Sequence, residues 1–361
     1  MRSLATLFLM SWLIAPTFGQ QNPDIQAIVN KAADQKLVYG TVVSVFHNGA
    51  MNTYSAGNFS QNTPYFAASI TKMYTTAVVM KLRSLGQLAL DDPIGKYLAP
   101  EVMEGLHVYQ GVDHSAQLTL RHLLTQTSGL PDYYEGERPG KPTVLDELLA
   151  GKDQYLPFEE VVAICKAGTP AFAPGEEGKA FYSDTNWRLV QQMLENITDT
   201  SIMALFEEYI FQPLALEKTY VFTDILDSTP APLFYKREPL YIPKAMSSFH
   251  SDGGIVTTAE ESLLFLKAFY TGKLFPKEYL GAMKDWNNIM NPLQYGTGMM
   301  RLNLPQLFTG GKNFDLMGHA GSSGAFAFYD PDRDIYLAGT VNQMHKRGTS
   351  FQLMMKVLNK M

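Results

Sequence analysis

Stretches with the pattern of β-strands lie near both ends of this chain, and helical patterns fill the region between them. Near the N-terminus, residues 42–47 and 51–56 flank Asn48-Gly49, a dipeptide that closes tight antiparallel hairpins. Near the C-terminus, residues 325–329 and 335–341 are separated by a turn that contains proline. This pattern indicates one sheet that contains strands from both ends of the chain. The sequence therefore predicts an α/β fold of the α+β type, with an antiparallel sheet flanked by helices and a mostly helical lobe inserted into it.

These elements predict a single domain, residues 22–361, with two lobes. Residues 22–80 and 245–361 are expected to form the α/β lobe, and residues 81–244 the mostly helical lobe. A helix over residues 69–85 is apolar on nearly every side, which is typical of a helix buried inside a fold. Other helices are predicted at 23–35, 118–127, 157–166, 185–198, 259–270 and 350–359, and a further strand at 254–257.

Composition limits what the chain can do. Of its 361 residues, 46% are hydrophobic and 18% are charged, as in folded globular proteins. Lys and Arg (29) are outnumbered by Asp and Glu (35), so there is no overall positive field to attract nucleic acid. The single cysteine, Cys165, excludes an intrachain disulfide. The usual zinc-protease, nucleotide and dinucleotide motifs are absent, so we expect no metal and no cofactor.

The first residues have the pattern of an export signal. Arg2 supplies a positive charge, and residues 4–15 form an apolar run. Pro16 ends this run, and Gly19 offers a small residue for cleavage. The run is shorter than the roughly 20 apolar residues of a membrane-spanning helix, which disfavours a membrane anchor. We expect residues 1–19 to be a signal peptide and the mature protein to be secreted or periplasmic, without a membrane span.

Ser69 and Lys72 open the buried helix and carry the strongest chemical signal. Side chains three residues apart on a helix lie on one face. A serine hydroxyl is a weak nucleophile until a base takes its proton, and burial favours the neutral lysine amine that can do so. The helix N-terminus adds amide donors where negative charge develops on an attacked carbonyl. A solvated helix cap is the alternative, but residues 66–68 and 73–80 are mostly apolar or small.

Two other segments are candidates for the same site. Tyr182 precedes a helical run, and a tyrosine beside a lysine cation is expected to have a lowered pKa and to exchange protons. The alternative is a simple helix cap formed by Ser183 or Asp184. Residues 318–324 form a glycine-rich segment with His319, where free amides can hold an oxyanion. The alternative there is a structural histidine.

Together these segments resemble a known pattern. In their order they are similar to the three motifs of the serine β-lactamase and penicillin-binding protein superfamily: Ser69-x-x-Lys72, Tyr182-x-Asp184 and His319-x-Gly321. Other landmarks of the family are matched by residues 118–131, 253–260 and 295–298. Nearest in pattern are class C β-lactamases, D-alanyl-D-alanine carboxypeptidases and β-lactamase-like esterases. The resemblance covers nearly the whole mature chain and implies a β-lactamase/transpeptidase-like fold.

The resemblance also implies a role for each residue. Ser69 would be the acylated nucleophile and Lys72 its proton acceptor. Tyr182 would share the proton relay, activating the serine and later the incoming water. The oxyanion would lie between the backbone amides of Ser69 and Ser322, while His319 would orient the carbonyl or carboxylate side of the substrate.

Two positions depart from the class C pattern. His319 stands where those enzymes usually carry lysine, and Asp184 where they carry asparagine; both, with Gly321, are assigned to the substrate side. A histidine is mostly neutral at pH 7 and attracts a carboxylate less than lysine does. Asp184 adds negative charge to the pocket unless it is paired. Both differences disfavour efficient β-lactamase action, and since no separate carboxylate is found for deacylation, that step falls to Tyr182 and Lys72.

The sequence therefore predicts an exported serine hydrolase that forms an acyl-enzyme on Ser69 and acts on a small ester, amide or D-amino-acid peptide. The alternatives among enzymes are a D,D-carboxypeptidase or D-aminopeptidase acting on cell-wall fragments, and a weak class C-like β-lactamase. Outside enzymes, they are a non-catalytic sensor of penicillin or peptidoglycan, and a scaffold. Loops 132–142 and 229–249 are expected to line the pocket. Aromatic side chains available there for stacking are Tyr133, Tyr134 and Phe249. The sequence gives neither the physiological substrate nor the oligomeric state.

Overall fold

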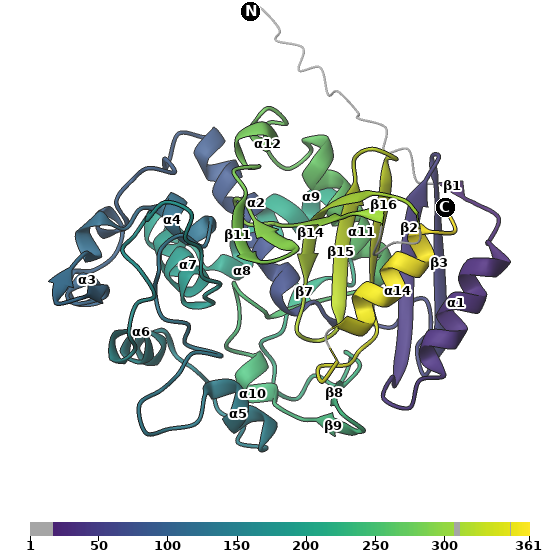
Figure 1. Cartoon of the computed structure of the whole chain (residues 1–361), viewed down its shortest axis with the longest axis horizontal. Coiled ribbons are helices and arrows are strands. Elements are labelled where there is room, and N and C mark those ends of the chain that lie inside the picture. The colour runs from purple at the N-terminus through teal and green to yellow at the C-terminus, as the bar shows by residue number, and fades with distance from the viewer. Residues whose placement is uncertain (1–16, 307–310, 347) are drawn as a thin grey trace, which may run out of the picture.

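A nine-stranded sheet forms the right-hand part of the molecule in the computed structural model (Figure 1), which describes residues 17–306, 311–346 and 348–361. Its strands are β1 (Thr17–Phe18), β2 (Gly40–His47), β3 (Ala50–Gly57), β11 (Asn287–Met290), β12 (Leu293–Tyr295), β13 (Met300–Leu304), β14 (Phe314–Ala320), β15 (Ala325–Asp330) and β16 (Ile335–Thr340). Their order across the sheet is β1-β3-β2-β16-β15-β14-β13-β12-β11.

Strands from both ends of the chain meet in this sheet, which confirms the predicted fold class. The C-terminal strand β16 pairs antiparallel with β2, and the turn between β2 and β3 has positive φ at both Asn48 and Gly49. β1 pairs with β3 in parallel at the edge of the sheet. This short strand includes residues that cleavage near Gly19 would remove. Residues 1–16 of the predicted signal peptide lie outside the described part of the chain.

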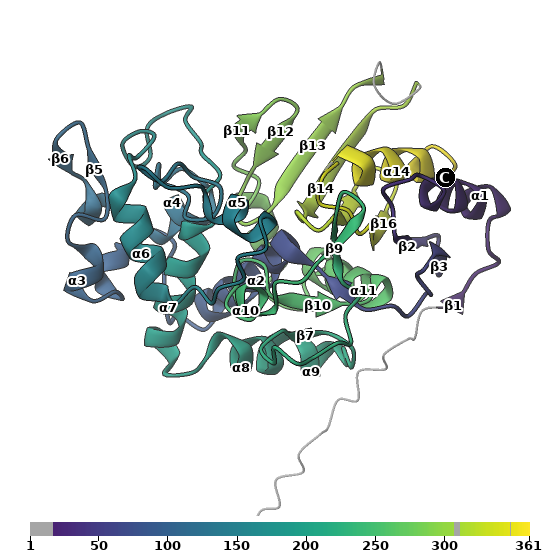
Figure 2. The ribbon, with the colours of Figure 1, turned by 90° about the horizontal axis from the view of Figure 1, so that it is seen from below.

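Helices cover both faces of the sheet (Figure 2). α1 (Pro23–Ala33) and α14 (Gly348–Leu358) pack together on one face, and α11 (Ala259–Thr271) covers the other against β2, β15 and β16. α2 (Thr71–Ser84) packs against α11, where the ring of Tyr74 stacks on that of Phe265 with centroids 3.5 Å apart. Eleven of the 14 residues of α2 are buried. The helix faces protein on nearly every side, which explains its mostly apolar sequence.

The segment between the two groups of sheet strands is mostly helical, and the predicted helices near 120, 160 and 190 are present as α4, α6 and α7. Its helices are η2 (Ile94–Lys96), α3 (Pro100–Met103), η3 (Ser115–Gln117), α4 (Leu120–Leu124), α5 (Val144–Leu149), α6 (Phe158–Ala167), α7 (Thr185–Thr198), α8 (Ile202–Phe206), η4 (Glu207–Phe211), α9 (Gln212–Leu214) and α10 (Pro243–Met246). Two hairpins interrupt them, β5 (Val108–Tyr109) with β6 (Val112–Asp113) and β8 (Leu233–Tyr235) with β9 (Glu238–Leu240). α12 (Tyr279–Ala282) follows α11.

The structure differs from the sequence prediction in its strands. The predicted strand near 255 exists as β10 (Ile255–Thr257), but it joins a separate three-stranded sheet with β4 (Tyr65–Phe66) and β7 (Tyr220–Val221). Strands β11 to β14 were not predicted. β14 contains Gly318, a residue that weakens strand patterns, and a Cβ there would lie 1.9 Å from the carbonyl oxygen of Ala327. Close packing of β14 against β15 therefore requires glycine at this position, and the same glycine makes the strand hard to predict from the sequence.

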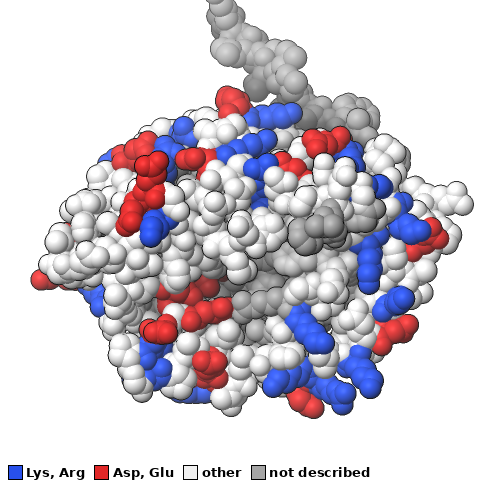
Figure 3. All heavy atoms as spheres, viewed as in Figure 1, with Lys and Arg blue, Asp and Glu red and all other residues white. Residues whose placement is uncertain are grey.

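Charged side chains of both signs are interspersed on the face shown in Figure 3, without a continuous basic surface on that face. This agrees with the net charge of −6. Among the described residues, no helix has the length and apolar character needed to cross a membrane.

We predict that Gly298→Ala destabilises the protein more than Gly86→Ala does. Both glycines have positive φ, so both substitutions carry a backbone cost of about 1–2 kcal/mol. A Cβ at Gly298 would also lie 1.8 Å from Oγ1 of Thr76 on α2, whereas nothing lies within 4 Å of one at Gly86. Overpacking of this kind adds about 1–3 kcal/mol. Urea unfolding of the two variants measures the difference, and equal free energies of unfolding would contradict the close contact.

Candidate active site

Ser69 lies in the short helical turn η1 (Ala68–Ile70), directly before α2. The preceding residue, Ala68, has φ of 48°, a left-handed conformation that costs a non-glycine residue energy and is often found at functional sites. The turn packs against β14 and β15. At Gly321 a Cβ would lie 2.4 Å from the carbonyl oxygen of Ala67, so only glycine lets the end of β14 approach the turn this closely.

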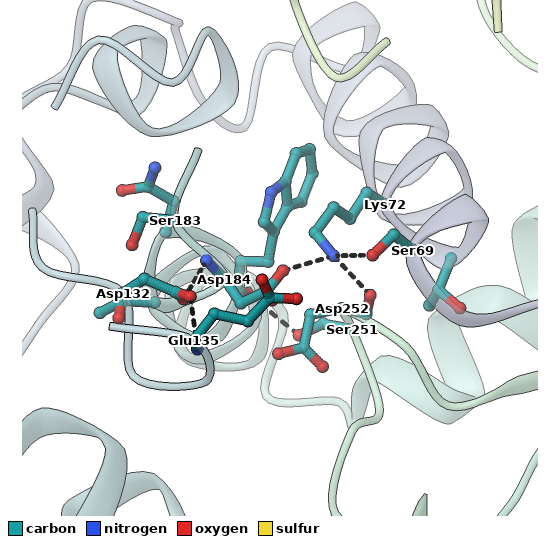
Figure 4. Close-up of polar contacts among 12 residues, drawn as sticks. Ser69, Lys72, Asp132, Glu135, Ser183, Asp184, Ser251 and Asp252 are labelled. Atoms are coloured by element: carbon teal, nitrogen blue, oxygen red, sulfur yellow. Dashed lines mark hydrogen bonds and ion pairs between the residues drawn. The ribbon is translucent and has the colours of Figure 1, made fainter. Parts of the chain in front are cut away.

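Lys72 is fully buried, and its ammonium contacts three acceptors (Figure 4). Nζ lies 2.9 Å from Oγ of Ser69 and 2.7 Å from the backbone carbonyl oxygen of Asp252. It also lies 2.6 Å from Oδ1 of Asp184. A lysine ammonium has three N–H donors, so this arrangement satisfies all of them. The structure therefore brings Ser69, Lys72 and Asp184 together, and the charge of Asp184 is paired.

Two more carboxylates, which the sequence analysis missed, lie behind Asp184. Asp132 accepts hydrogen bonds from the backbone amides of Asp184 (2.8 Å) and Glu135 (2.7 Å). Asp252 accepts one from the hydroxyl of Tyr133 (2.7 Å). Burial, reinforced by the charge of Asp184, raises the pKa of Asp132 to about 7, and burial raises the pKa of Asp252. The site thus holds more acidic groups than its motifs indicate.

A signal for these carboxylates was present in the sequence. Asp132 directly follows the landmark at 118–131, and Asp252 directly precedes the one at 253–260. A carboxylate next to a landmark that packs against the site is a reasonable candidate. Only the fold, however, brings the two segments together.

Tyr182 precedes α7 and is held in place by the segment that follows α4. Gln126 accepts hydrogen bonds at Oε1 from the amide of Ser183 (2.9 Å) and from the side chain of Asn186 (2.6 Å). Its backbone carbonyl accepts one from the amide of Phe181 (2.9 Å). These bonds explain why the landmark at 118–131 accompanies the tyrosine motif, because one side chain fixes the start of α7.

The environment of Tyr182 corrects one expectation. Burial, reinforced by the negative charge of Asp184, holds the pKa of this phenol well above its ordinary value, and the Ser69 hydroxyl offsets this only in part. The Lys72 ammonium lies 5.4 Å from the ring centroid, but its charge is shared with Asp184. The predicted lowering of the Tyr182 pKa is therefore wrong, and the residue is a neutral phenol at pH 7.

His319 lies on strand β14 rather than in a loop, and its ring is buried. Nδ1 lies 2.8 Å from the carbonyl oxygen of Ala320, so Nδ1 carries the proton, and Nε2 accepts from the hydroxyl of Tyr295 at 3.0 Å. Burial, together with the charge of Lys72, lowers the pKa of His319 to about 3. The rings of Tyr295 and Tyr182 lie 5.8 Å apart. Tyr295 thus links His319 to the catalytic candidates, a contact that the sequence did not reveal.

Ser322 lies in the turn between β14 and β15 and lines the same pocket as Ser69. Its backbone N–H has no hydrogen-bond partner within the described ranges. The neighbouring Ser323 donates from Oγ to the carbonyl oxygen of Phe66 (2.7 Å), which ties this turn to β4. A free amide beside the nucleophile is what an oxyanion hole requires.

A pocket open to solvent lies beside these groups. Tyr133, Tyr134 and Phe249 line it, as the sequence analysis expected of the loops that carry them. Its other apolar lining residues are Phe66, Ala68, Leu233, Ile242, Met246 and Met344. Its polar lining residues are Ser69, Asp184, Asp252, Ser322 and Ser323. In the described part of the chain, no cluster of three or more His, Cys, Asp or Glu side chains is arranged to hold a metal ion.

Comparisons with known proteins agree with this geometry. Residues 25–354 match the profile of the Beta-lactamase family. A D-alanyl-D-alanine-carboxypeptidase/endopeptidase of Escherichia coli K12, AmpH, is 25% identical over 210 residues, which are 58% of this chain and 50% of the relative. The chain thus matches about half the length of that protein.

Solved structures show the same fold. A D-stereospecific amidohydrolase from Streptomyces sp. has a TM-score of 0.75 at 25% identity, with 92% of this chain and 98% of the other covered. A D-amino acid amidase from Ochrobactrum anthropi SV3 has a TM-score of 0.76 at 19% identity, with 93% and 100% covered, a likeness of fold alone. Because the family profile covers most of the chain, the protein belongs to the Beta-lactamase family.

Proposed function

We propose that the protein hydrolyses small esters, amides or D-amino-acid peptides through an acyl-enzyme formed on Ser69. The observation that carries this proposal is the 2.9 Å contact between Oγ of Ser69 and Nζ of Lys72 at the edge of the pocket. Within the described residues, Ser69 is the pocket hydroxyl that contacts a buried base candidate. Ser323, by contrast, uses its hydroxyl to bind the backbone.

The proton relay begins with Lys72. As an ammonium it donates to Ser69 and cannot take the serine proton, so it first transfers one proton to Asp184, whose Oδ1 lies 2.6 Å away. The neutral amine then accepts the proton of Ser69 as Oγ bonds to the acyl carbon. Tyr182, a neutral phenol, donates its proton to the leaving oxygen or nitrogen and regains one from Lys72. In deacylation, water loses a proton to this relay and Ser69 leaves as the hydroxyl.

The backbone amides of Ser69 and Ser322 stabilise the negative oxygen of the tetrahedral intermediate. The Ser322 amide has no partner among the described residues and belongs to a turn that Gly321 and Ser323 hold against Ser69. Removal of one such donor typically reduces turnover by about 100- to 1000-fold. His319 positions the end of β14 through its buried hydrogen bond with Tyr295.

The relatives and the pocket narrow the substrate. The Streptomyces neighbour is a D-stereospecific amidohydrolase and the Escherichia coli relative a carboxypeptidase/endopeptidase, which supports amide or ester substrates. Two observations disfavour efficient β-lactamase action. His319 is neutral, and both charged residues that line the pocket are acidic. A non-catalytic sensor has no chemical need for the complete relay. Export by the N-terminal signal remains part of this proposal, because its apolar run lies outside the described residues.

Replacing Ser69 with alanine should abolish both covalent labelling and turnover, because the acyl group is attached to Oγ. Intact-mass spectrometry with benzylpenicillin and with a short-chain p-nitrophenyl ester measures both, and Ser60→Ala, at an exposed serine, is the control. Hydrolysis retained by Ser69→Ala would place the nucleophile elsewhere. A persistent penicillin adduct would favour a penicillin-binding peptidase or sensor, and rapid penicillin turnover a β-lactamase.

Lys72→Ala should slow acylation by at least about 100-fold, the low end of what a general base contributes. Lys81→Ala removes a partly exposed lysine from the same helix α2 and should leave the rate unchanged. Stopped-flow bursts of p-nitrophenol report acylation, and circular dichroism shows whether each variant is folded. A folded Lys72→Ala variant with the wild-type burst rate would exclude Lys72 as the base.

His319 should stay neutral between about pH 5 and pH 8, because burial lowers its pKa to about 3. The imidazole takes up a proton near pH 3 in the folded protein but near pH 6.5 in the unfolded chain. As the pH falls from about 6.5 towards 3, His319 therefore lowers the free energy of unfolding. NMR of the imidazole nitrogens, assigned with His319→Ala, should show one Nδ1-protonated tautomer throughout. A titration midpoint near 6.5 would refute the buried hydrogen-bonded ring.

A further inference from the structure

The charged lining of the pocket is one-sided. Asp184 and Asp252 are its two charged lining residues within the described chain. Lys72 is buried behind Ser69 and already contacts three acceptors, so it presents no N–H to a substrate. A substrate carboxylate would therefore meet negative charge without a cation to pair with, at a large electrostatic cost.

Asp252 has an unused acceptor in this pocket. Its Oδ2 accepts from the hydroxyl of Tyr133, whereas Oδ1 is buried without a hydrogen-bond partner among the described residues. The residue is 4% exposed. A buried carboxylate oxygen without a donor is costly, so a substrate group that donates a hydrogen bond to it would stabilise the site.

The cations near Asp252 do not bind this oxygen. Arg188 donates from Nη1 and Nη2 to the backbone carbonyls of Ser248 and Leu156, and it forms no ion pair with Asp252. The Lys72 ammonium contacts the backbone carbonyl of Asp252 and not its carboxylate. Burial raises the pKa of Asp252, as expected for a carboxylate that lacks a close cation.

The position of Asp252 relates this acceptor to the nucleophile. The backbone carbonyl of Asp252 and Oγ of Ser69 bind the same Lys72 ammonium, so the two residues lie on neighbouring sides of the reaction centre (Figure 4). In an amino acid derivative, the α-nitrogen is one bond from the carbon next to the acyl carbon. With the acyl carbon at Ser69, a cationic α-amine would lie between Ser69 and Asp252. The side chain of the bound amino acid would then reach Phe249, Tyr134 and the other apolar lining residues.

We infer that Asp252 binds an ammonium group of the substrate, and that the enzyme acts on amides or esters of amino acids that carry a free α-amine and an apolar or aromatic side chain. This inference rests on the proposed function, because it assigns the substrate class of the Ser69 site. In this proposal a carboxylate recognises the substrate. Class C enzymes instead carry a lysine at the position of His319.

The test compares four probes that differ only around the α-carbon: D-phenylalanine amide, L-phenylalanine amide, N-acetyl-phenylalanine amide and 3-phenylpropionamide. At pH 6.5 the free α-amine is cationic, since its pKa is close to 8. Each probe is assayed for hydrolysis and for protection of Ser69 against a fluorophosphonate, so that binding is measured even where turnover is slow. Asp252→Asn removes the charge with nearly the same shape, and Tyr133→Phe removes only the hydroxyl that binds Asp252.

We expect one form of phenylalanine amide to protect Ser69 at concentrations at least about 10-fold lower than either uncharged probe, as a hydrogen bond to a charged group implies. Asp252→Asn should bring this ratio towards one, whereas Tyr133→Phe should keep it. Equal protection by all probes in the wild-type protein, or a preference that survives in Asp252→Asn, would overturn the inference. The wild-type comparison decides the matter even if Asp252→Asn does not fold.

The same samples separate the two levels of the proposal. Fluorophosphonate labelling of Ser69 without a preference for the cationic probe would reject the role of Asp252 and leave the serine hydrolase intact. No labelling and no hydrolysis in the wild-type protein would reject the proposed function and, with it, the substrate class.

Discussion

The buried ammonium of Lys72 is the interaction on which the rest of the site depends. A lysine taken wholly out of water is stable only if its donors are satisfied, and three acceptors from distant parts of the chain meet this need: Ser69, Asp184 and the backbone of Asp252. Each belongs to a different segment, so the cation fixes the nucleophile turn, the start of α7 and the approach to β10 relative to one another. The same contacts align the residues of the proton relay that we propose.

The unusual residues of the site form a consistent set. Asp184, where class C enzymes carry asparagine, forms an ion pair with Lys72, while His319, where they carry lysine, is neutral and buried against Tyr295. Together with Asp252 they give the pocket an acidic character. A pocket of this kind suits uncharged or cationic substrates, because a carboxylate would have to be desolvated beside like charges.

The parts of the site that the sequence could predict are those formed by local geometry. Ser69 and Lys72 are three residues apart at the start of a helix, so their proximity follows from helix periodicity alone. Tyr182 could be found only through the family resemblance, since its position depends on Gln126 and the fold around α7. Asp132, Asp252 and Tyr295 were missed because their roles arise from contacts between segments far apart in the chain.

The sequence by itself determined the fold class, the buried helix and the serine–lysine pair, because each follows from a pattern of neighbouring residues. The tertiary structure decided the protonation of the site: burial and the charge of Asp184 raise the pKa of Tyr182, and burial lowers that of His319. It also placed the unpartnered oxygen of Asp252 in the pocket. Desolvation and charge proximity depend on what surrounds a group in space, and residue order does not specify those surroundings until the chain is folded.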